Sequence, residues 1–409
     1  MRAFAFVSVL SLSMVLFAFI VMPVYADLSW NVQTLNDENA LVGGNCPIVV
    51  DSNGTAHIAY MAFLNQTNSL IYTSSNSPVW VNQTVDTGNL SNVFSLVLDA
   101  NGNPHILYDA GPVSGSANSL KLASYDGINW EVQNTGIYSD EATLEFDHLG
   151  NPHIAFITEG SILNYANWTE TAWNIEIADN STVDTFEGLS LAFDSENSPF
   201  IVYNASSVVF GSQYLRLAYV LNAEWRYQVL SVGGRPDGYG NLAVDANDYR
   251  HTVFAMNNRV FYASFYRSYY DHQIVVSNVT LDTVGGLCFD SQDNPHFCYT
   301  TKNHEIVYMT RSNGSWSNQI VDSGSAYGRS DLTLDSNGYV HISYLTNSST
   351  TNSTNLMYAK STTVVPENIS LVTVTVVGAA FASAIAVNIV FRKRTHHPST
   401  REVLACYAS

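Results

Sequence analysis

Basic residues are scarce in this chain of 409 residues, which has 16 Lys and Arg against 35 Asp and Glu. The formal net charge is −19 at pH 7. An acidic surface repels the phosphate backbone of DNA and RNA, so the composition argues against a nucleic-acid partner. Calcium and cationic partners are more compatible with this charge. No calcium-binding motif is present, however, so the sequence predicts no metal site and no cofactor.

Cysteine is also rare: the chain has four, and their spacing is not typical of a zinc site. Cys288 and Cys298 flank one predicted turn, two residues before and eight residues after Asp290. They are either two small core residues, like Val49 and Ala59 at the same places in another repeat, or a cross-strand disulfide in an oxidising compartment. The sequence leaves both interpretations open.

Repetition, in contrast, is abundant. One pattern occurs seven times, as VDSNGTAHIAY, LDANGNPHILY, FDHLGNPHIAF, FDSENSPFIVY, VDANDYRHTVF, FDSQDNPHFCY and LDSNGYVHISY. Its acids are Asp51, Asp99, Asp147, Asp194, Asp245, Asp290 and Asp335. Their successive spacings of 48, 48, 47, 51, 45 and 45 residues match the length of one four-stranded propeller blade. Seven copies predict seven blades.

Each copy has the pattern of a β-hairpin. Apolar residues alternate before the acid, and Asp, Asn, Gly and Pro then supply the turn. Six copies have a histidine six residues after the acid: His57, His105, His153, His251, His296 and His341. Phe200 replaces it in the fourth copy. A catalytic pair is needed once, so we interpret the repeated Asp and His as structural: the acid accepts turn N–H groups, and the imidazole contacts the acid or packs against the next blade.

The two ends of the repeat region predict how the ring closes. An aromatic residue, usually Trp, begins the last strand of each unit about 20 residues before the next repeated acid, and Trp30 stands 21 residues before Asp51. The last unit ends after residues 355–360 without such a strand. We therefore expect the N-terminal strand to complete the last blade, which leaves no sheet edge free at the closure. The predicted fold is an all-β, seven-bladed β-propeller over residues 27–360.

The flanking segments predict export and anchoring. Residues 1–26 have Arg2, a long apolar run and VYA before Asp27, which is typical of a signal peptide. Residues 361–368 would be a stalk and the uncharged residues 369–391 a transmembrane helix. The basic residues 392–394 begin a predicted cytoplasmic tail, 392–409. The protein is thus expected to be a single-pass protein of the cell membrane with an extracellular propeller. Twelve N-x-S/T sequons agree with a glycoprotein.

Residues that do not repeat are the candidates for function. The segments just before each inner strand are expected to ring the mouth of the central channel. They contain Asp140 and the following candidate ligand-binding residues: Glu141, Phe186, Glu187, Arg235, Asp237, Tyr239, Tyr327, Arg329 and Asp331. Carboxylates beside aromatic residues and an arginine could bind a sugar or a cation, or supply the acid and base of a glycosidase. They could equally be ordinary solvated loops, and no catalytic residue is assigned.

The repeat D-x-x-G-x-P-H-I-x-Y resembles the secreted β-propellers near the sialidase (BNR, Asp-box) superfamily. The Asp-box pattern would require Trp where this chain has His or Ile, and the Arg-Ile-Pro motif that accompanies the sialidase arginine triad is missing. At the other end, VPEN, an apolar span and RKR (365–394) resemble the PEF-type sorting signals of archaeal surface proteins. Asn368 stands where those signals have Phe.

These features predict a membrane-anchored extracellular propeller that acts as a non-catalytic recognition module for a glycan or a surface protein. One alternative is a sialidase-like glycan-processing enzyme, either a glycoside hydrolase or a polysaccharide lyase. Another is a structural component of the cell envelope. Fold alone does not decide among them, because propellers carry many functions.

Overall fold

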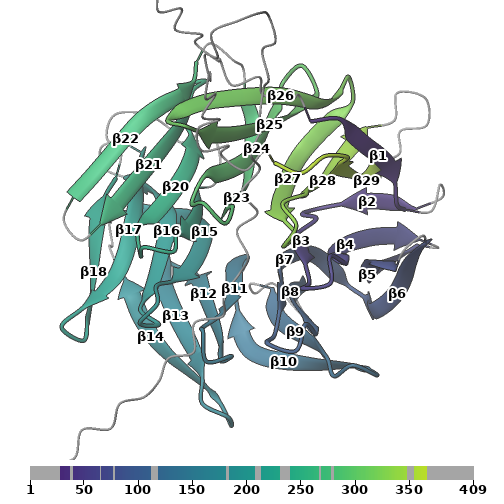
Figure 1. The fold of residues 1–409 in the computed structure, drawn as a ribbon. Coiled ribbons are helices and arrows are strands. Elements are labelled where there is room, and N and C mark those ends of the chain that lie inside the picture. Colours follow the sequence, from purple (N-terminus) through teal and green to yellow (C-terminus); the bar gives the residue numbers. More distant parts are fainter. Residues whose placement is uncertain are drawn as a thin grey trace, which may run out of the picture. The chain divides into compact units, whose positions relative to one another are not determined.

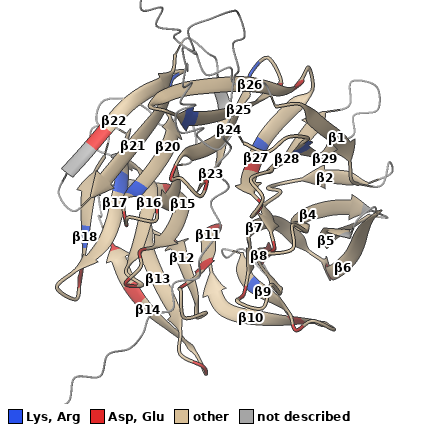
Figure 2. Ribbon diagram, in the orientation of Figure 1, with Lys and Arg blue, Asp and Glu red and all other residues tan. Residues whose placement is uncertain are grey.

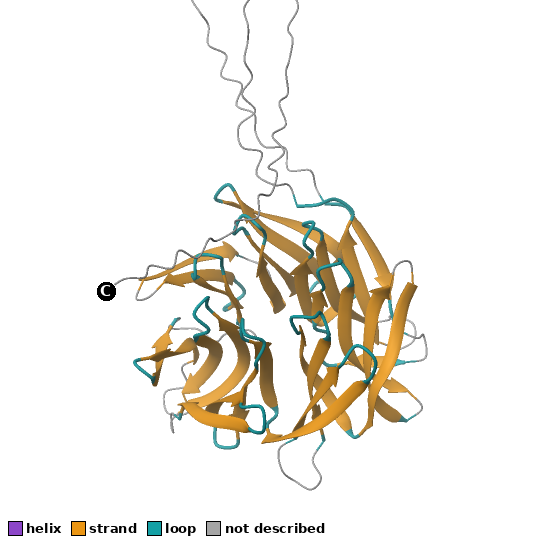
Figure 3. Cartoon of the chain, turned by 60° about the horizontal axis from the view of Figure 1, so that its bottom comes forward, coloured by secondary structure: helices purple, strands orange, loops and turns teal. Residues whose placement is uncertain are grey.

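The structure, a computed structural model, describes residues 28–365 apart from 37–39, 65, 77–78, 112–117, 181–183, 208–212, 231–239, 267–268, 278–280 and 348–353. Figure 3 shows that strands joined by loops make up this part of the chain. Within it there is no helix of the length and hydrophobicity needed to cross a membrane. The predicted signal peptide (1–26), transmembrane helix (369–391) and tail (392–409) lie outside the described residues. Ser361, the first residue of the predicted stalk, belongs to the last strand.

Seven antiparallel sheets form the predicted seven-bladed propeller, which confirms the all-β fold (Figure 1). Blade 1 contains β2 (Leu41–Gly43), β3 (Ile48–Val50), β4 (Ala56–Leu64), β5 (Thr67–Asn76) and β6 (Val79–Gly88). Blade 2 contains β7 (Leu90–Leu98), β8 (Pro104–Ala110), β9 (Ser119–Tyr125) and β10 (Trp130–Tyr138). Blade 3 contains β11 (Glu141–Phe146), β12 (Pro152–Thr158), β13 (Ile162–Trp168) and β14 (Trp173–Asp179).

The remaining blades follow the same order from the innermost to the outermost strand. Blade 4 contains β15 (Asp184–Phe193), β16 (Pro199–Ser207), β17 (Gln213–Leu221) and β18 (Glu224–Val229). Blade 5 contains β19 (Asn241–Val244), β20 (Arg250–Ala255), β21 (Val260–Tyr266) and β22 (Tyr269–Val276). Blade 6 contains β23 (Leu281–Phe289), β24 (Pro295–Thr301), β25 (Glu305–Ser312) and β26 (Ser315–Ser323). Blade 7 contains β27 (Ala326–Leu334), β28 (Val340–Asn347) and β29 (Thr354–Ser361), and is completed by β1 (Trp30–Thr34).

The pairing of β1 with β29 closes the ring as the sequence predicts. The two strands are antiparallel, with Trp30 opposite Ser361 and Thr34 opposite Met357. Leu28 and Trp30 also pack in the apolar cluster between blades 6 and 7. The N-terminal strand therefore contributes both backbone hydrogen bonds and buried apolar surface to the last blade.

The repeated acid organises the turn in every blade. Its Oδ1 accepts the backbone N–H groups of the second and fourth residues after it, at 2.8–3.1 Å in all seven turns. In the six blades with a repeated histidine, His Nε2 lies 3.1–3.7 Å from the other carboxylate oxygen. Burial lowers the pKa of His341 to about 4, with Lys360 adding to the effect, so this imidazole is neutral at pH 7.

The histidine also connects each turn to the next blade. In five blades His Nδ1 lies 2.5–2.7 Å from a tyrosine hydroxyl of the third strand, as in the pair His57 and Tyr72. These five tyrosine rings contact the outer-strand Trp of the following blade, with centroids 4.8–5.6 Å apart. In blade 4, which lacks the histidine, Arg250 of blade 5 lies 4.4 Å from the ring of Phe200. The repeated residues thus form contacts that hold turns and blades together.

Candidate functional site

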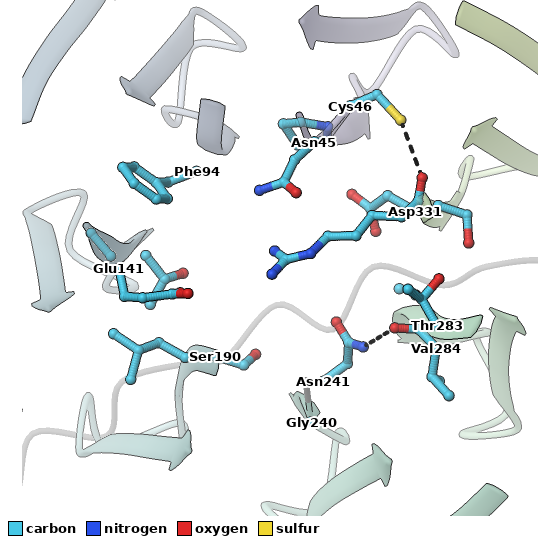
Figure 4. A pocket seen from close by; sticks show the side chains of 18 residues that line it. Asn45, Cys46, Phe94, Glu141, Ser190, Gly240, Asn241, Thr283, Val284 and Asp331 are labelled. Carbon is cyan, nitrogen blue, oxygen red and sulfur yellow. Dashed lines mark hydrogen bonds between the residues drawn. The ribbon is translucent and has the colours of Figure 1, made fainter. Parts of the chain in front are cut away.

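The innermost strands of all seven blades surround a central channel. Its mouth is a cavity of about 170 Å³. Figure 4 shows Asn45, Phe94, Glu141, Asn241 and Asp331 placed around one open space. A second cavity of about 440 Å³ continues the channel toward the repeated turns, and Asp331 lines both. Residues distant in the sequence therefore converge at the mouth.

The inner edges of the blades have no neighbouring strand in their own sheet, so side chains from the preceding blade bind their backbone groups. Ser95 Oγ accepts the N–H of Leu144 at 2.9 Å, and Ser190 Oγ accepts the N–H of Leu242 at 3.0 Å. Asn241 Nδ2 donates to the carbonyl oxygen of Val284 at 3.1 Å. The polar residues around the channel are thus partly structural.

Asp331 takes this linking position between blades 7 and 1. Its Oδ2 accepts the N–H of Ile48 at 3.0 Å, and its Oδ1 accepts the N–H of Leu332 at 2.8 Å. Burial raises the pKa of Asp331 to about 6 despite these two hydrogen bonds. The structure therefore places this predicted ligand-binding residue at the mouth, with each carboxylate oxygen engaged by a backbone group.

Arg329 reaches the mouth through an irregular start of β27, which also carries Tyr327. The register between β27 and β28 shifts between Tyr327 and Ser330. Gly328 within the irregularity has a φ of 65°, and its carbonyl oxygen accepts a hydrogen bond from Thr283 Oγ1 at 2.8 Å. Arg329 lines the mouth cavity and Tyr327 is 48% exposed. Such bulges redirect side chains. Figure 2 shows that β27 carries both a basic and an acidic residue.

The other predicted site residues are divided among different environments. Glu141 lines the mouth, whereas Phe186 is 7% exposed and packs in the core between blades 3 and 4, with its ring 5.2 Å from that of Tyr203. Glu187 is exposed. Asp140 is also exposed, and its Oδ1 accepts the N–H of Asn118 at 3.2 Å. Arg235, Asp237 and Tyr239 lie outside the described residues.

His304 is a further candidate that the sequence interpretation missed. It is exposed in the turn between β24 and β25, and its Nδ1 lies 3.0 Å from the carbonyl oxygen of Ala326, directly before Tyr327. Because a carbonyl only accepts, Nδ1 carries the proton and Nε2 of the neutral ring has the free lone pair. His304 does not belong to the repeated set, which is the sequence signal that could have shortlisted it.

Glu145 is a second missed residue. It lies on β11, four residues after Glu141, and lines the second cavity of about 440 Å³. Burial raises the pKa of Glu145 to about 7, although its Oε1 accepts the N–H of Phe146 at 3.2 Å. The repeat could have revealed this burial, since the same position is apolar or small in the other blades: Val49, Val97, Ala192, Ala243, Cys288 and Thr333.

Cys46, Cys288 and Cys298 are free thiols, which favours the core-residue interpretation of Cys288 and Cys298 over the disulfide. The tight turn pairs Phe289 with Pro295 and Cys288 with His296, while Cys298 lies opposite Gly285. The two cysteines are therefore not cross-strand partners. Cys298 is fully buried between blades 6 and 7, Cys288 packs against the same cluster, and burial raises the pKa of both thiols. Among the described residues, no group of three or more His, Cys, Asp or Glu could hold a metal ion.

Comparison with known proteins places the chain by fold. No protein-family profile and no curated protein sequence matches it. Among solved structures, an ulvan lyase of polysaccharide lyase family PL25 bound to -[GlcA(1-4)Rha3S]- is 11% identical, with a TM-score of 0.57 over 78% of this chain and 93% of that one. The polysaccharide lyase Uly1 is 8% identical, with a TM-score of 0.55 over 80% and 92%. A protein of unknown function from Dyadobacter fermentans is 10% identical, with a TM-score of 0.50 over 80% and 98%.

These likenesses correct the predicted function. At 8–11% identity they show the fold alone. Two of these structures are polysaccharide lyases, which corrects the prediction of a non-catalytic recognition module.

Proposed function

We propose that this protein is a glycan-processing enzyme, a polysaccharide lyase that cleaves uronate-containing chains at the mouth of the channel. The observation that carries the proposal is the placement of Arg329 in the mouth cavity. The exposed Tyr327 lies two residues before Arg329, and His304 contacts the carbonyl oxygen of Ala326 at the start of the same strand. The ulvan lyases share the fold and support the choice of substrate class.

A lyase needs no co-reactant. A base removes the proton on C5 of the uronate, the electron pair forms the C4–C5 double bond, the C4–O bond breaks, and the leaving oxygen takes up a proton. Arg329 would pair with the uronate carboxylate and stabilise the negative charge that develops on it. His304 Nε2 would be the base, because Nδ1 donates to Ala326. Tyr327 would return a proton to the leaving oxygen.

The arrangement of the acids favours this reaction over hydrolysis. A glycosidase normally requires two carboxyl groups that converge on the scissile bond. Asp331 already binds the backbone N–H groups of Ile48 and Leu332. Glu141 is then the remaining carboxylate among the described residues that line the mouth cavity. With Asp331 engaged by two backbone groups, the described mouth residues do not present the convergent pair of carboxyl groups that a hydrolase uses.

The test is to incubate the full-length protein with a panel of uronate-containing polysaccharides and to follow two signals. A lyase produces the ultraviolet absorbance of the C4–C5 double bond in step with new reducing ends. A hydrolase produces reducing ends without that absorbance. Neither signal with any uronate polymer would refute the proposal.

Variants assign the roles. Arg329→Ala should lower kcat/KM by about 10²–10³-fold, and His304→Ala should lower kcat by about 10²–10⁴-fold. The control is Arg226→Ala, since Arg226 is an exposed residue of the outer strand β18 that pairs with Glu224. If both mouth variants cleave like the unmodified protein while remaining folded, the site is elsewhere.

We further propose that the enzyme works outside a membrane to which it is attached. The supporting features are the signal-like residues 1–26, the apolar residues 369–391 and the basic residues 392–394. Protease treatment of intact cells should degrade the propeller and leave a membrane-bound C-terminal fragment. Recovery of the full chain in the soluble fraction would contradict this.

A further inference from the structure

A tyrosine recurs at the junctions between blades, nine residues after the repeated acid. Three of these tyrosines donate to an aspartate at the end of the preceding blade's outer strand. Tyr108 donates to Asp86 at 2.7 Å, Tyr203 to Asp179 at 2.6 Å and Tyr344 to Asp322 at 2.8 Å. All three tyrosines are at most 1% exposed. Burial of a hydroxyl is normally accompanied by such a bond.

Blade 3 lacks the tyrosine where the preceding blade lacks the aspartate. Blades 3 and 5 have Phe156 and Phe254 at the tyrosine position. The outer strand before blade 3 has Gly136 six residues after its Trp, where the aspartates stand. In blade 1 the residue at the tyrosine position is Tyr60. The residue of blade 7 that corresponds to the aspartates is Asn36, six residues after Trp30.

Tyr299 of blade 6 breaks this pattern. The residue of blade 5 that corresponds to the three aspartates is Val276. Val276 follows a register shift between β21 and β22 and stands opposite Val260. In the same way, Asp322 follows a register shift between β25 and β26 and stands opposite Ile306. Tyr299 is 4% exposed, and its hydroxyl has no hydrogen-bond partner among the residues that the structure describes. Tyr299 lines a pocket, so its hydroxyl can donate to a ligand or to water there.

The space left at this junction is a pocket of about 360 Å³, lined by the end of β22 and by strands β24–β26. Tyr299 and Glu305 lie in its lining, together with the exposed Asn318. Val276 and Val307 supply apolar surface. A pocket of this volume with a few polar groups on apolar walls is typical of a small-ligand site.

The charge of the pocket selects among ligands. Val307 stands opposite Tyr299, where Lys121 and Arg216 stand opposite Tyr108 and Tyr203. The described residues of the lining therefore include no cation, and Glu305 contributes a carboxylate.

Glu305 Oε2 accepts the hydroxyl of Thr301 at 3.1 Å and retains further acceptor capacity. An anion would be repelled by Glu305. A neutral polyol can accept from the tyrosine and donate to the carboxylate.

We propose that this pocket binds a neutral monosaccharide unit, whose hydroxyl oxygen accepts from Tyr299 and whose hydroxyl proton is donated to Glu305. The turn between Thr301 and Glu305 also carries His304, which contacts the carbonyl oxygen of Ala326. Assignment of the sugar to a polysaccharide substrate rests on the proposed function, whereas binding of the sugar itself does not require turnover.

The test is ligand-observed NMR of the full-length protein with L-rhamnose, D-galactose, D-mannose and D-xylose as neutral probes and D-glucuronate as the anionic one. We expect at least one neutral sugar to bind and glucuronate to bind more weakly. Tyr299→Phe should weaken the sugar about 3- to 10-fold, the value of one hydrogen bond. It should leave Tm unchanged, because the hydroxyl has no protein partner to lose.

Two matched variants complete the test. Val276→Asp restores the junction of the other blades, so it should abolish sugar binding. Tyr344→Phe removes a hydroxyl that does bond to an aspartate, so it should lower Tm without changing sugar binding. The proposal is overturned if no neutral sugar binds, if glucuronate binds as tightly as the neutral sugar, or if Tyr299→Phe binds the sugar with unchanged affinity. Loss of sugar binding in Arg329→Ala would place the sugar at the mouth and overturn it too. Sugar binding without polymer cleavage would retain this inference and refute the lyase.

Discussion

At the end of the ring where the repeated turns lie, all seven blades are built alike, whereas the mouth is built from different residues in almost every blade. The turn acid accepts the same two backbone N–H groups each time. Six residues before that acid, toward the mouth end of the inner strands, the described residues are Asn45, Val93, Glu141, Gly188, Val284 and Arg329. The repeated turns stabilise the packing of the blades. The residues at the mouth can therefore vary and form a binding or catalytic site.

Removal of β1 should have the largest effect on this scaffold. Deleting residues 28–36 takes away the outer strand of blade 7 and the packing of Leu28 and Trp30. We expect a loss of about 5 kcal/mol or more in unfolding free energy, from two or three buried apolar side chains and a strand ladder. Thermal unfolding measures it, with the exposed Asn31→Ser as control. Unchanged melting of the deleted protein would mean that β1 does not close the ring.

Loss of one turn acid should weaken the repeated end by less. Burial alone would raise the pKa of Asp290, but hydrogen bonds from His296, Asn294 and Gln292 lower it to about 2. A lowered pKa means that the charged form stabilises the fold at neutral pH, and that this is lost as the pH falls from about 4 to about 2. Asp290→Asn should therefore cost about 2 kcal/mol at pH 7 in denaturant unfolding. The difference should shrink toward pH 2; a constant difference would contradict the assignment.

Asp331 at the mouth should behave in the opposite way. Its pKa is raised to about 6 by burial, so the folded protein holds this proton more tightly than the unfolded chain does. The unfolding free energy then falls as the pH rises from about 4 to about 6, and the cost persists above pH 6. Asp331→Asn keeps an acceptor for Ile48 but loses the one for Leu332, so it should raise stability at pH 7 by only about 1 kcal/mol. The exposed Asp140→Asn is the control. A variant less stable at pH 7 would show that the charge is stabilising.

The smallest expected effect on stability comes from adding one hydrogen bond to a series that links the turns of neighbouring blades. Asn197, Asp248 and Asp293 accept backbone N–H groups of the preceding blade's turn at 2.8–3.2 Å. Blade 3 has Gly150 at this position, with a φ of 85° and open space where a Cβ atom would point. Gly150→Asn should exceed Gly150→Ala in stability by about 1 kcal/mol, because Asn tolerates this backbone and supplies the acceptor. Equal melting temperatures would show that no ladder forms.

Much of the fold was predictable because repetition makes it visible. The spacing of Asp51 to Asp335 predicts the blades, and the lone Trp30 strand predicts the closure. The pairing of Cys288 and Cys298 was wrong because register depends on how tightly the turn closes, which the spacing does not state. The burial of Phe186 was missed because residues near the end of a loop do not reveal which of them point into the core.

The site was less predictable because it depends on irregularities. The bulge that brings Arg329 into the mouth involves Gly328 and a contact with Thr283 from another blade. The unpaired hydroxyl of Tyr299 becomes apparent only when Val276 is aligned by register with the aspartates of other blades. The sequence could only have shortlisted His304, because His148, His272, His396 and His397 also stand outside the repeated histidines.

The most direct test compares the two ends of the ring in one assay. Cleavage of a uronate-containing polysaccharide by Arg329→Ala and by Asp290→Asn should be measured below the melting temperature of both. The account predicts that Arg329→Ala melts like the unmodified protein but loses cleavage by about 10²–10³-fold, whereas Asp290→Asn melts earlier and cleaves normally. Full cleavage by a folded Arg329→Ala, or its loss in a folded Asp290→Asn, would contradict the division between a structural end and a chemical end.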